Sequence, residues 1–173
     1  MLTLILGGAR SGKSRYAEQL ASQSGHKIIY IATAVAGDDE MQARIKRHQL
    51  DRPDHWPTIE EPVNLAQVLS QESAPGKCLL VECLTLWLNN IMLVHDEESP
   101  QPRFEHRIKK LLDTLPELPG DVILVSNEIG MGVVPMGNIS RSFVDETGRL
   151  HQKLAKICDC VTLMIAGLPQ KLK

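Results

Sequence analysis

The residues with the most definite chemistry in this sequence form a glycine-rich turn after its first apolar run. Glycines let successive backbone N–H groups face inward as an anion-binding concavity, and a following helix points its positive end at the same place. We expect Lys13 to reach the outer phosphates of a nucleotide and the Ser14 hydroxyl to ligate Mg²⁺. The pattern GxxxxGK followed by Ser or Thr is matched at every fixed position by Gly7, Gly8, Ala9, Arg10, Ser11, Gly12, Lys13 and Ser14. The turn therefore predicts a nucleoside triphosphate site.

A magnesium-dependent phosphate site needs a second part, an acid at the end of another buried strand. The stretch "KCLLVECL" supplies Glu82 at the end of an apolar run. A carboxylate there is costly unless it meets a cation or hydrogen-bond donors. We expect Glu82 to bind Mg²⁺ directly or through water, and the alternative is a carboxylate that emerges into solvent.

These residues must be positioned by the elements around them. Short, nearly continuous apolar runs alternate with helical periods, one from Phe104 to Leu115 and one from Ile139 to Ile157. Such runs are typical of strands covered on both faces, so we predict an α/β fold with a mostly parallel open sheet flanked by helices. The predicted strands are Leu2–Leu6, Ile28–Ala32, Cys78–Glu82, Val122–Ser126 and Val161–Ile165.

Prolines indicate where the chain leaves these elements. We predict loops at "SPQPR" (Ser99–Arg103) and at Leu115–Asp121, and an irregular piece from Leu50 to Pro62. The length of 173 residues suits one domain over 1–173.

Composition narrows the classes of partner. With 43% hydrophobic residues, 23% charged residues and a net charge of −2, the chain can bury an ordinary core and gives no reason to expect nucleic acid or an anionic membrane as a partner. No apolar run reaches the length of a membrane span, and the first one does not have the form of a signal peptide. The four cysteines flank or precede apolar runs, as buried reduced thiols do, so we expect a cytoplasmic protein.

A phosphate-binding loop does not by itself name a function. The sequence has no NKxD-type guanine motif, and its "DETG" string (Asp145–Gly148) lies inside a helical period instead of following a strand. It also has no transporter-type LSGGQ string. These observations favour a small-molecule transferase over a switch or a transporter.

One charged segment contains a candidate nucleophile. In "GDDEMQARIKRHQLDRP", Asp38 is a good helix N-cap, and Met41, Ile45 and His48 share one helical face. His48 has either a structural role on that face or a nucleophilic one. The neighbouring arginines and lysine would lower the pKa of its imidazole and keep it neutral, as attack on phosphorus requires. The residues alone leave both interpretations open.

Five stretches together resemble the bifunctional adenosylcobinamide kinase / adenosylcobinamide-phosphate guanylyltransferase family of cobalamin biosynthesis. They are "GGARSGKS", "YIAT", "RIKRHQLDRPDHWPTIEEP", "ECLTLWLNN" and "SNEIGMGVVP", in this order through nearly the whole chain. The resemblance implies a P-loop NTPase fold of the RecA-like kind. It also implies two reactions: phosphorylation of adenosylcobinamide with ATP or GTP, then transfer of GMP from GTP to the new phosphate with release of pyrophosphate.

The resemblance also implies roles for individual residues. His48 matches the family's guanylylated histidine, and the nearby His55 is the weaker alternative. The nucleotide-contacting positions that it implies beyond the glycine-rich turn are Ala32, Thr33, Ala34, Arg52, Glu60 and Glu82. Many relatives have Asp where this chain has Glu82. With Mg²⁺ bound at Ser14 and Glu82, Lys13 would assist catalysis in both reactions.

A loop after the fourth predicted strand completes the expected site. The glycines of "SNEIGMGVVP", Gly130 and Gly132, permit a close backbone approach, and carboxyl ends of parallel strands are where open sheets bind ligands. We expect this loop to face the corrinoid or a phosphate, with Asn127 and Glu128 near the chemistry. A plain strand-to-helix turn is the alternative. The resemblance further implies a homotrimer.

Overall fold

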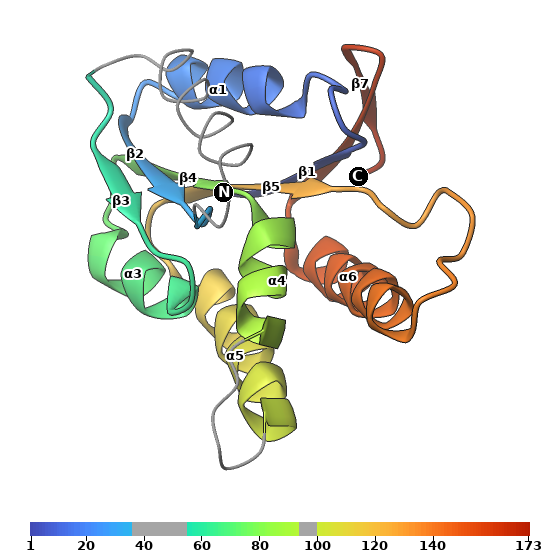
Figure 1. The fold of residues 1–173 in the computed structure, drawn as a ribbon. Helices are drawn as coiled ribbons and strands as arrows, with labels where there is room; N and C mark the ends of the chain where they lie inside the picture. Colours follow the sequence, from blue (N-terminus) through green and yellow to red (C-terminus); the bar gives the residue numbers. More distant parts are fainter. Residues whose placement is uncertain (36–54, 94–99) are drawn as a thin grey trace.

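The computed structural model describes residues 1–35, 55–93 and 100–173 of the chain. Among these residues, seven strands form one sheet in the order β3-β2-β4-β5-β1-β6-β7. Six of the strands run parallel, and β7 is antiparallel to β6. The predicted α/β architecture with a mostly parallel sheet is confirmed (Figure 1).

All five predicted strands are present within a residue of their expected bounds. Both faces of the central strands are covered, which explains their continuous apolar character: every residue of β1 is buried. The observed bounds are β1 Leu2–Gly7, β2 Lys27–Ala32, β4 Lys77–Glu82, β5 Asp121–Asn127 and β6 Cys160–Ile165.

Helices cover both faces of the sheet (Figure 1). On one face α1 packs its buried Ala17 and Ala21 against Ile5, Leu80 and other core side chains. The opposite face is the larger core, built around Trp87. The described helices are α1 Lys13–Gln23, α3 Leu65–Glu72, α4 Leu84–Leu93, α5 Pro100–Thr114, the 3-10 turn η1 Leu115–Glu117 and α6 Asn138–Ile157. The predicted helical period from Phe104 to Leu115 falls in α5 and the first residue of η1, and the one from Ile139 to Ile157 falls in α6.

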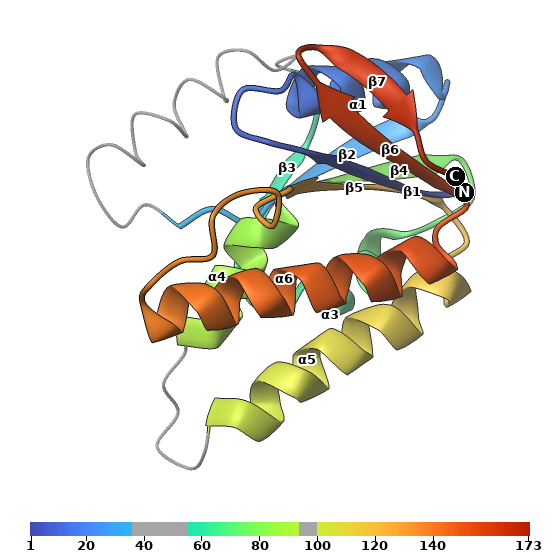
Figure 2. The same ribbon diagram turned by 90° about the vertical axis from the view of Figure 1, so that its right-hand side faces the viewer.

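The strand order decides which loops can meet. Strand β5 lies between β1, which leads into the phosphate-binding turn, and β4, which ends at Glu82. Gly7 is in register with Asn127, and Ala32 with Glu82. The carboxyl ends of all six parallel strands lie at the same end of the sheet, while both chain termini lie at the opposite end (Figure 2).

Two predictions drawn from prolines are wrong. Pro100 starts helix α5, so "SPQPR" is mostly helical and not a loop. Proline is tolerated in the first turn, where backbone N–H groups have no intrahelical partner. The second error is the piece from Leu50 to Pro62, which contains strand β3, Thr58–Glu60. It pairs in parallel with β2 at one edge of the sheet, and β7, Leu168–Lys171, forms the opposite edge.

The cysteines have the predicted environment in three cases out of four. Cys78, Cys83 and Cys158 are buried and free, and Cys160 is free and half-buried. Burial raises the pKa of Cys78 to about 11 and that of Cys158 to about 12. In the described part of the chain, we find no helix that combines the length and the apolar character needed to cross a membrane.

Candidate functional site

The glycine-rich turn connects the end of β1 to the start of α1. Helix α1 begins after Gly12, which has a φ of 89° and no side chain to cap the first N–H groups. A Cβ on Gly7 would lie 2.9 Å from the backbone oxygen of Met164, so the turn also needs glycine at its first position. Helix α1 thus begins directly at the turn, so its positive end is available to a phosphate there.

A hairpin turn between β6 and β7 (Leu168–Lys171) packs against this loop. Gly167 N–H donates to Ser11 O at 2.9 Å. A Cβ on Gly12 would lie 3.2 Å from Gly167 Cα, so the two backbones touch. The sequence did not suggest β7, because all four of its residues are exposed and one is proline.

Two polar side chains of the loop are buried. Lys13 is only 8% exposed, and its Nζ donates to Gly8 O at 3.3 Å, which folds the ammonium group back over the loop. Ser11 Oγ is buried and has no hydrogen-bond partner among the described residues. A buried hydroxyl and ammonium beside a concave backbone fit the oxygen atoms of a phosphate chain.

The side chains of Ser14 and Glu82 contact each other near the carboxyl ends of the parallel strands. The Ser14 hydroxyl donates a hydrogen bond to Glu82 Oε1, and Tyr30 Oη lies 3.4 Å from Glu82 Oε2. One carboxylate and one hydroxyl side by side are hard oxygen donors of the kind Mg²⁺ takes together with waters and nucleotide phosphates. Within the described ranges no group of three or more His, Cys, Asp or Glu residues could hold a metal by itself. The pair therefore fits a metal ion that arrives with its nucleotide.

The predicted nucleotide-contacting residues at the end of β2 differ in burial and in hydrogen bonding. Thr33 is fully buried, and its hydroxyl both accepts from Cys83 N–H and donates to Cys83 O, each at 2.8 Å. Asn90 Nδ2 donates to Thr33 O at 2.8 Å. Ala32 and Ala34 are half-buried. Thr33 therefore joins the end of β2 to the backbone of the residue after Glu82. This contact helps to hold the backbone of Glu82 in position.

Glu60 ends β3 in register with Ala32, and β3 lies two strands further from the phosphate loop than β4, which ends at Glu82. It is exposed, so its carboxylate is accessible from solvent. His55 is exposed as well, with its ring edge against Trp56 at 6.3 Å between centroids. His48 and Arg52 lie outside the described residues, so their predicted roles stay predictions.

The loop after β5 starts beside the phosphate-binding turn. Glu128 N–H donates to Gly7 O at 3.0 Å, and Asn127 is in register with Gly7. Beyond them the loop is exposed and apolar up to the start of α6. Its exposed hydrophobic residues are Met131, Val133, Val134 and Met136, followed by Ile139 in the first turn of α6. Asn127 and Glu128 therefore lie at the same end of the sheet as the phosphate-binding turn and the Ser14–Glu82 pair.

Sequence analysis missed a group of buried polar residues beneath this loop: Thr85, Ser126 and His151. His151 Nε2 lies 2.7 Å from Ser126 Oγ, and its Nδ1 lies 3.6 Å from Glu128 Oε2. Burial lowers the pKa of His151, and the nearby Glu128 carboxylate opposes that effect in part. A signal existed in the sequence, since His151 falls on the apolar stripe of α6 with Leu150 and Leu154.

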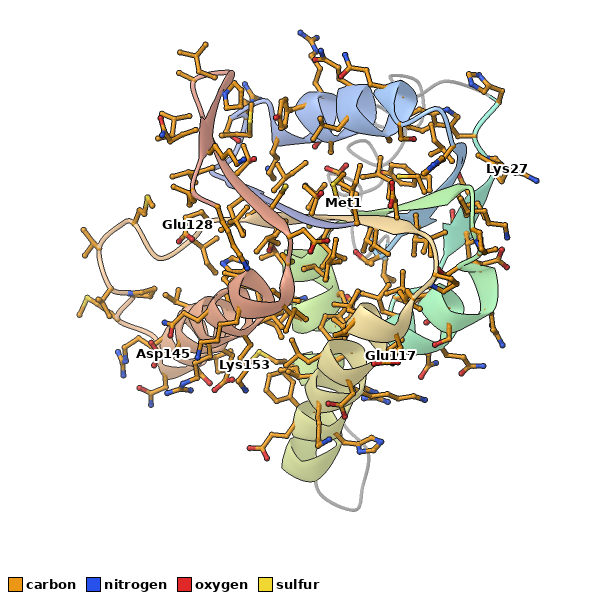
Figure 3. All side chains as sticks on the ribbon, turned by 180° about the vertical axis from the view of Figure 1, so that it is seen from behind. Met1, Lys27, Glu117, Glu128, Asp145 and Lys153 are labelled. Carbon is orange, nitrogen blue, oxygen red and sulfur yellow. The ribbon has the colours of Figure 1, made fainter. Side chains whose placement is uncertain are left out.

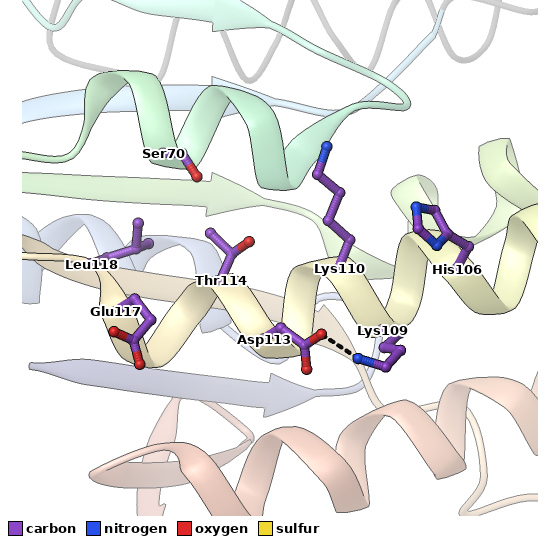
Figure 4. Close-up of a pocket in the computed structure, with 8 residues that line it drawn as sticks. All are labelled: Ser70, His106, Lys109, Lys110, Asp113, Thr114, Glu117 and Leu118. Atoms are coloured by element: carbon purple, nitrogen blue, oxygen red, sulfur yellow. Dashed lines mark hydrogen bonds and ion pairs between the residues drawn. The ribbon is translucent and has the colours of Figure 1, made fainter.

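A groove lies elsewhere, against α5 and η1 (Figure 4). It measures about 580 Å³ and includes Lys109, Lys110, Asp113 and Glu117, with Lys109 paired to Asp113. Leu118, which leads toward the start of β5, also lines it. Seven of the eight residues that line the groove have polar side chains, and none of the predicted site residues is among them.

Solved structures with the same fold include a helicase, an ATPase and a recombinase. The chain superposes on a DnaB-like replicative helicase with a TM-score of 0.53 at 16% identity, covering 94% of this chain and 46% of that one. It matches an ATPase from the type III secretion system of pathogenic bacteria with a TM-score of 0.56 at 11% identity, covering 98% and 56%. The RadB recombinase gives 0.51 at 14% identity, covering 94% and 73%. These likenesses establish the fold as a RecA-like P-loop NTPase fold.

Sequence relatives identify the family. The chain is 57% identical over 173 residues to the bifunctional adenosylcobalamin biosynthesis protein CobP of Pseudomonas aeruginosa, covering 100% of this chain and 98% of that one. It is 37% identical over 182 residues to the bifunctional adenosylcobalamin biosynthesis protein CobU of Escherichia coli, covering 100% of both. The family model for cobinamide kinase / cobinamide phosphate guanyltransferase matches residues 3–172. The chain belongs to the cobinamide kinase / cobinamide phosphate guanyltransferase family.

Proposed function

We propose that this protein phosphorylates adenosylcobinamide with ATP or GTP and then transfers GMP from GTP to the product, forming adenosylcobinamide-GDP and pyrophosphate. The observation that carries the proposal is the contact of Ser14 with Glu82 beside the buried Lys13, in a chain of this family. This arrangement supports the proposal, because a hydroxyl, a carboxylate and an ammonium group close together suit the outer phosphates of a nucleotide and their metal ion.

In the phosphorylation step the chain's own groups bind and orient the nucleotide. The backbone N–H groups of the loop and the start of α1 hold the phosphates, and Lys13 neutralises charge as the γ-phosphoryl group moves to the corrinoid hydroxyl. Ser14 and Glu82 would hold Mg²⁺, which supplies further neutralisation of the phosphate oxygens when bound. Ser11, with its buried hydroxyl, adds a hydrogen bond to a phosphate oxygen.

In the second step we propose His48 as the nucleophile. Neutral His48 attacks the α-phosphorus of GTP, a P–N bond forms, and the bond to the β-phosphate oxygen breaks to release pyrophosphate. The corrinoid phosphate then attacks the same phosphorus, and the P–N bond breaks to return the histidine. Arg52 and Glu60 are the further nucleotide contacts that we propose, and the apolar loop after Glu128 is the surface that we propose for the corrinoid. We propose a homotrimeric assembly, in the cytoplasm.

The test uses GTP labelled at either the α- or the γ-phosphate. The protein is incubated with each, denatured and weighed, and separately assayed for label transfer to adenosylcobinamide. We expect an acid-labile, base-stable GMP adduct that His48→Ala abolishes. His106→Ala is the matched control, because His106 lies exposed on α5, and this variant should keep the adduct.

Each contrary outcome has a definite meaning. An adduct that is lost in His55→Ala but kept in His48→Ala would move the nucleophile to His55. Transfer of γ-label without any α-label adduct would reduce the proposal to a simple kinase with a structural His48. Absence of both transfers would refute the enzymatic proposal and leave nucleotide binding alone.

A further inference from the structure

A buried series of polar contacts runs from the start of α4 to the loop after β5. Asn127 N–H donates to Thr85 Oγ1 at 2.7 Å, and Thr85 Oγ1 lies 3.1 Å from Ser126 Oγ. Ser126 Oγ lies 2.7 Å from His151 Nε2. The other ring nitrogen of His151, Nδ1, lies 3.6 Å from Glu128 Oε2. The series therefore links helices α4 and α6 through β5 to one carboxylate.

The hydrogen bonds of this series can all be donated in one direction, from Asn127 toward His151. Thr85 Oγ1 accepts from Asn127, so its own hydrogen is available to Ser126. The hydrogen of Ser126 is then available to Nε2 of a neutral His151, and the ring proton stands on Nδ1, toward Glu128. Burial favours this neutral form, because it lowers the pKa of His151. Every hydroxyl hydrogen of the series thereby has an acceptor.

A serine, a histidine and an acid in contact suggest a nucleophilic triad, but burial excludes that role. Ser126 is fully buried in β5, and Thr85 beside it is 6% exposed, so no substrate carbonyl or phosphorus can reach the hydroxyl. Glu128 is the member that solvent reaches, with a side chain 19% exposed. The reactive end of the series is therefore the carboxylate.

Glu128 is held beside the phosphate-binding turn. Its N–H donates to Gly7 O at 3.0 Å, and its Oε1 accepts from Gly130 N–H at 2.6 Å. It follows β5, the strand between the one that leads into the loop and the one that ends at Glu82. Figure 3 shows it where the loop leaves the sheet, above α6. Each carboxylate oxygen has a second lone pair, so both can accept a further hydrogen.

We propose that Glu128 accepts the proton of the acceptor hydroxyl during phosphoryl transfer, and that His151 is the residue that positions it. The proposal rests on the kinase activity proposed above. The hydroxyl oxygen bonds to the γ-phosphorus while the bond from that phosphorus to the β,γ-bridging oxygen breaks. The proton passes to the Glu128 carboxylate, and the electron pair of the broken bond leaves with the nucleoside diphosphate. The proton then returns to solvent from the exposed side of Glu128.

Three other polar residues that the structure describes at the carboxyl ends of the strands suit the role less well. Asn127 has an amide, which is not a proton acceptor at neutral pH. Glu82 already accepts from Ser14 and faces the proposed metal site. Glu60 lies beyond β2 and β4, on the far side of the sheet from the loop. Glu128 alone of the four has a carboxylate beside Gly7 that is not committed to that metal site.

The experiment measures transfer of γ-label from ATP to adenosylcobinamide in Glu128→Gln and His151→Asn. We expect Glu128→Gln to lower kcat about 100-fold with the nucleotide KM within about twofold, since the amide keeps the shape and cannot take the proton. His151→Asn keeps a polar partner for Ser126, and we expect its kcat to fall about tenfold through loss of orientation. Formate at high concentration should restore part of the rate in Glu128→Ala.

The matched controls are Glu146→Gln and His106→Asn. Glu146 pairs with Arg149 on α6, away from the series, and His106 lies exposed on α5, so both variants should keep the wild-type kcat. Formation of the GMP adduct from GTP alone is a second control. It needs no acceptor hydroxyl, so we expect Glu128→Gln to retain it, and this also reports correct folding.

Several outcomes would overturn the inference. If Glu128→Gln keeps kcat within about threefold of wild type and raises only the KM for the acceptor, Glu128 anchors the loop and is no base. If His151→Asn changes the melting temperature but not kcat, His151 has no positioning role. If Glu128→Gln fails to fold, a folded Glu128→Ala that keeps the wild-type kcat without formate serves as the contrary result. Wild-type protein that transfers no γ-label would instead refute the proposed function itself.

Discussion

The Ser14 hydroxyl donates a hydrogen bond to Glu82 Oε1 although 68 positions separate the two residues in the sequence. Ser14 lies in the first turn of α1, and Glu82 ends β4, which β5 separates from β1. The sheet therefore brings a hydroxyl and a carboxylate from distant parts of the chain to one point.

Glu82→Gln should weaken the response to Mg²⁺. The amide keeps the hydrogen bond with Ser14 but loses the negative charge, so we expect phosphoryl transfer to fall about 10- to 100-fold at a fixed Mg²⁺ concentration. A magnesium titration of the rate measures the effect, and added Mg²⁺ should recover part of it. Glu117→Gln, exposed on η1, is the control. Equal magnesium curves for Glu82→Gln and wild type would disprove a metal role.

Gly12→Ala should be destabilising as well as harmful to nucleotide binding. A φ of 89° costs an L-residue with a side chain about 1–2 kcal/mol, and the new Cβ would lie 3.2 Å from Gly167 Cα. Urea unfolding measures the free energy of unfolding. Gly148→Ala is the contrast: its Cβ would meet nothing within 4 Å in helix α6, so this change should stabilise by about 0.5–1 kcal/mol.

Thr33→Val should lower stability more than Thr33→Ser. Valine keeps the shape but leaves the buried N–H and C=O of Cys83 without their 2.8 Å partner, at a cost of about 1–3 kcal/mol. Serine keeps both hydrogen bonds and loses one methyl group, at about 1 kcal/mol. Denaturant midpoints of the two variants decide the matter. Equal losses would mean that the hydroxyl contributes no more than packing.

His151 should make stability fall as the solution becomes more acidic. Burial, opposed in part by Glu128, sets the folded-state pKa of His151 below its ordinary value of 6.5, so the unfolded chain binds the proton more readily. Its contribution to the free energy of unfolding is therefore complete above about pH 6.5 and is lost as the pH falls from there toward the folded-state pKa.

The measurement is the free energy of unfolding of wild type and His151→Asn between about pH 7 and pH 5. We expect the wild type to lose more stability than the variant over this interval, because asparagine does not titrate. Parallel curves would show that His151 has the same pKa in both states. His106→Asn should follow the wild-type curve, since His106 is exposed on α5.

What the sequence predicted depended on whether the signal was local. The central strands were found because both of their faces are buried, as in β1 from Leu2 to Gly7. Strands β3 and β7 were missed because they lie at the edges of the sheet and most of their side chains are exposed. Only backbone hydrogen bonds mark them as strands, and a sequence pattern does not show those. "SPQPR" misled because proline in a first helical turn resembles proline in a loop.

The same distinction applies to the site. The phosphate-binding turn is contiguous, so its spacing alone identified it, and Glu82 was indicated by an acid at the end of an apolar run. The contacts of Ser126 with Thr85 and His151 join three separate elements. No spacing within one segment encodes them, and only the arrangement of β5 between α4 and α6 brings the three side chains together. The hydrogen bonds of Thr33 with the backbone of Cys83 likewise join two separate segments, while its place at the nucleotide stays a prediction.

The hairpin turn at Gly167 has a consequence for the order of folding during synthesis. The ribosome makes Ser11 and Gly12 early, yet the neighbour that contacts both of them is made much later. β1 likewise pairs with β5 and β6, which follow late in the chain. The nascent protein therefore contains the sequence of the phosphate-binding turn long before that turn has all of its contacts. Nucleotide affinity should emerge only when Gly167 and its neighbours have left the exit tunnel.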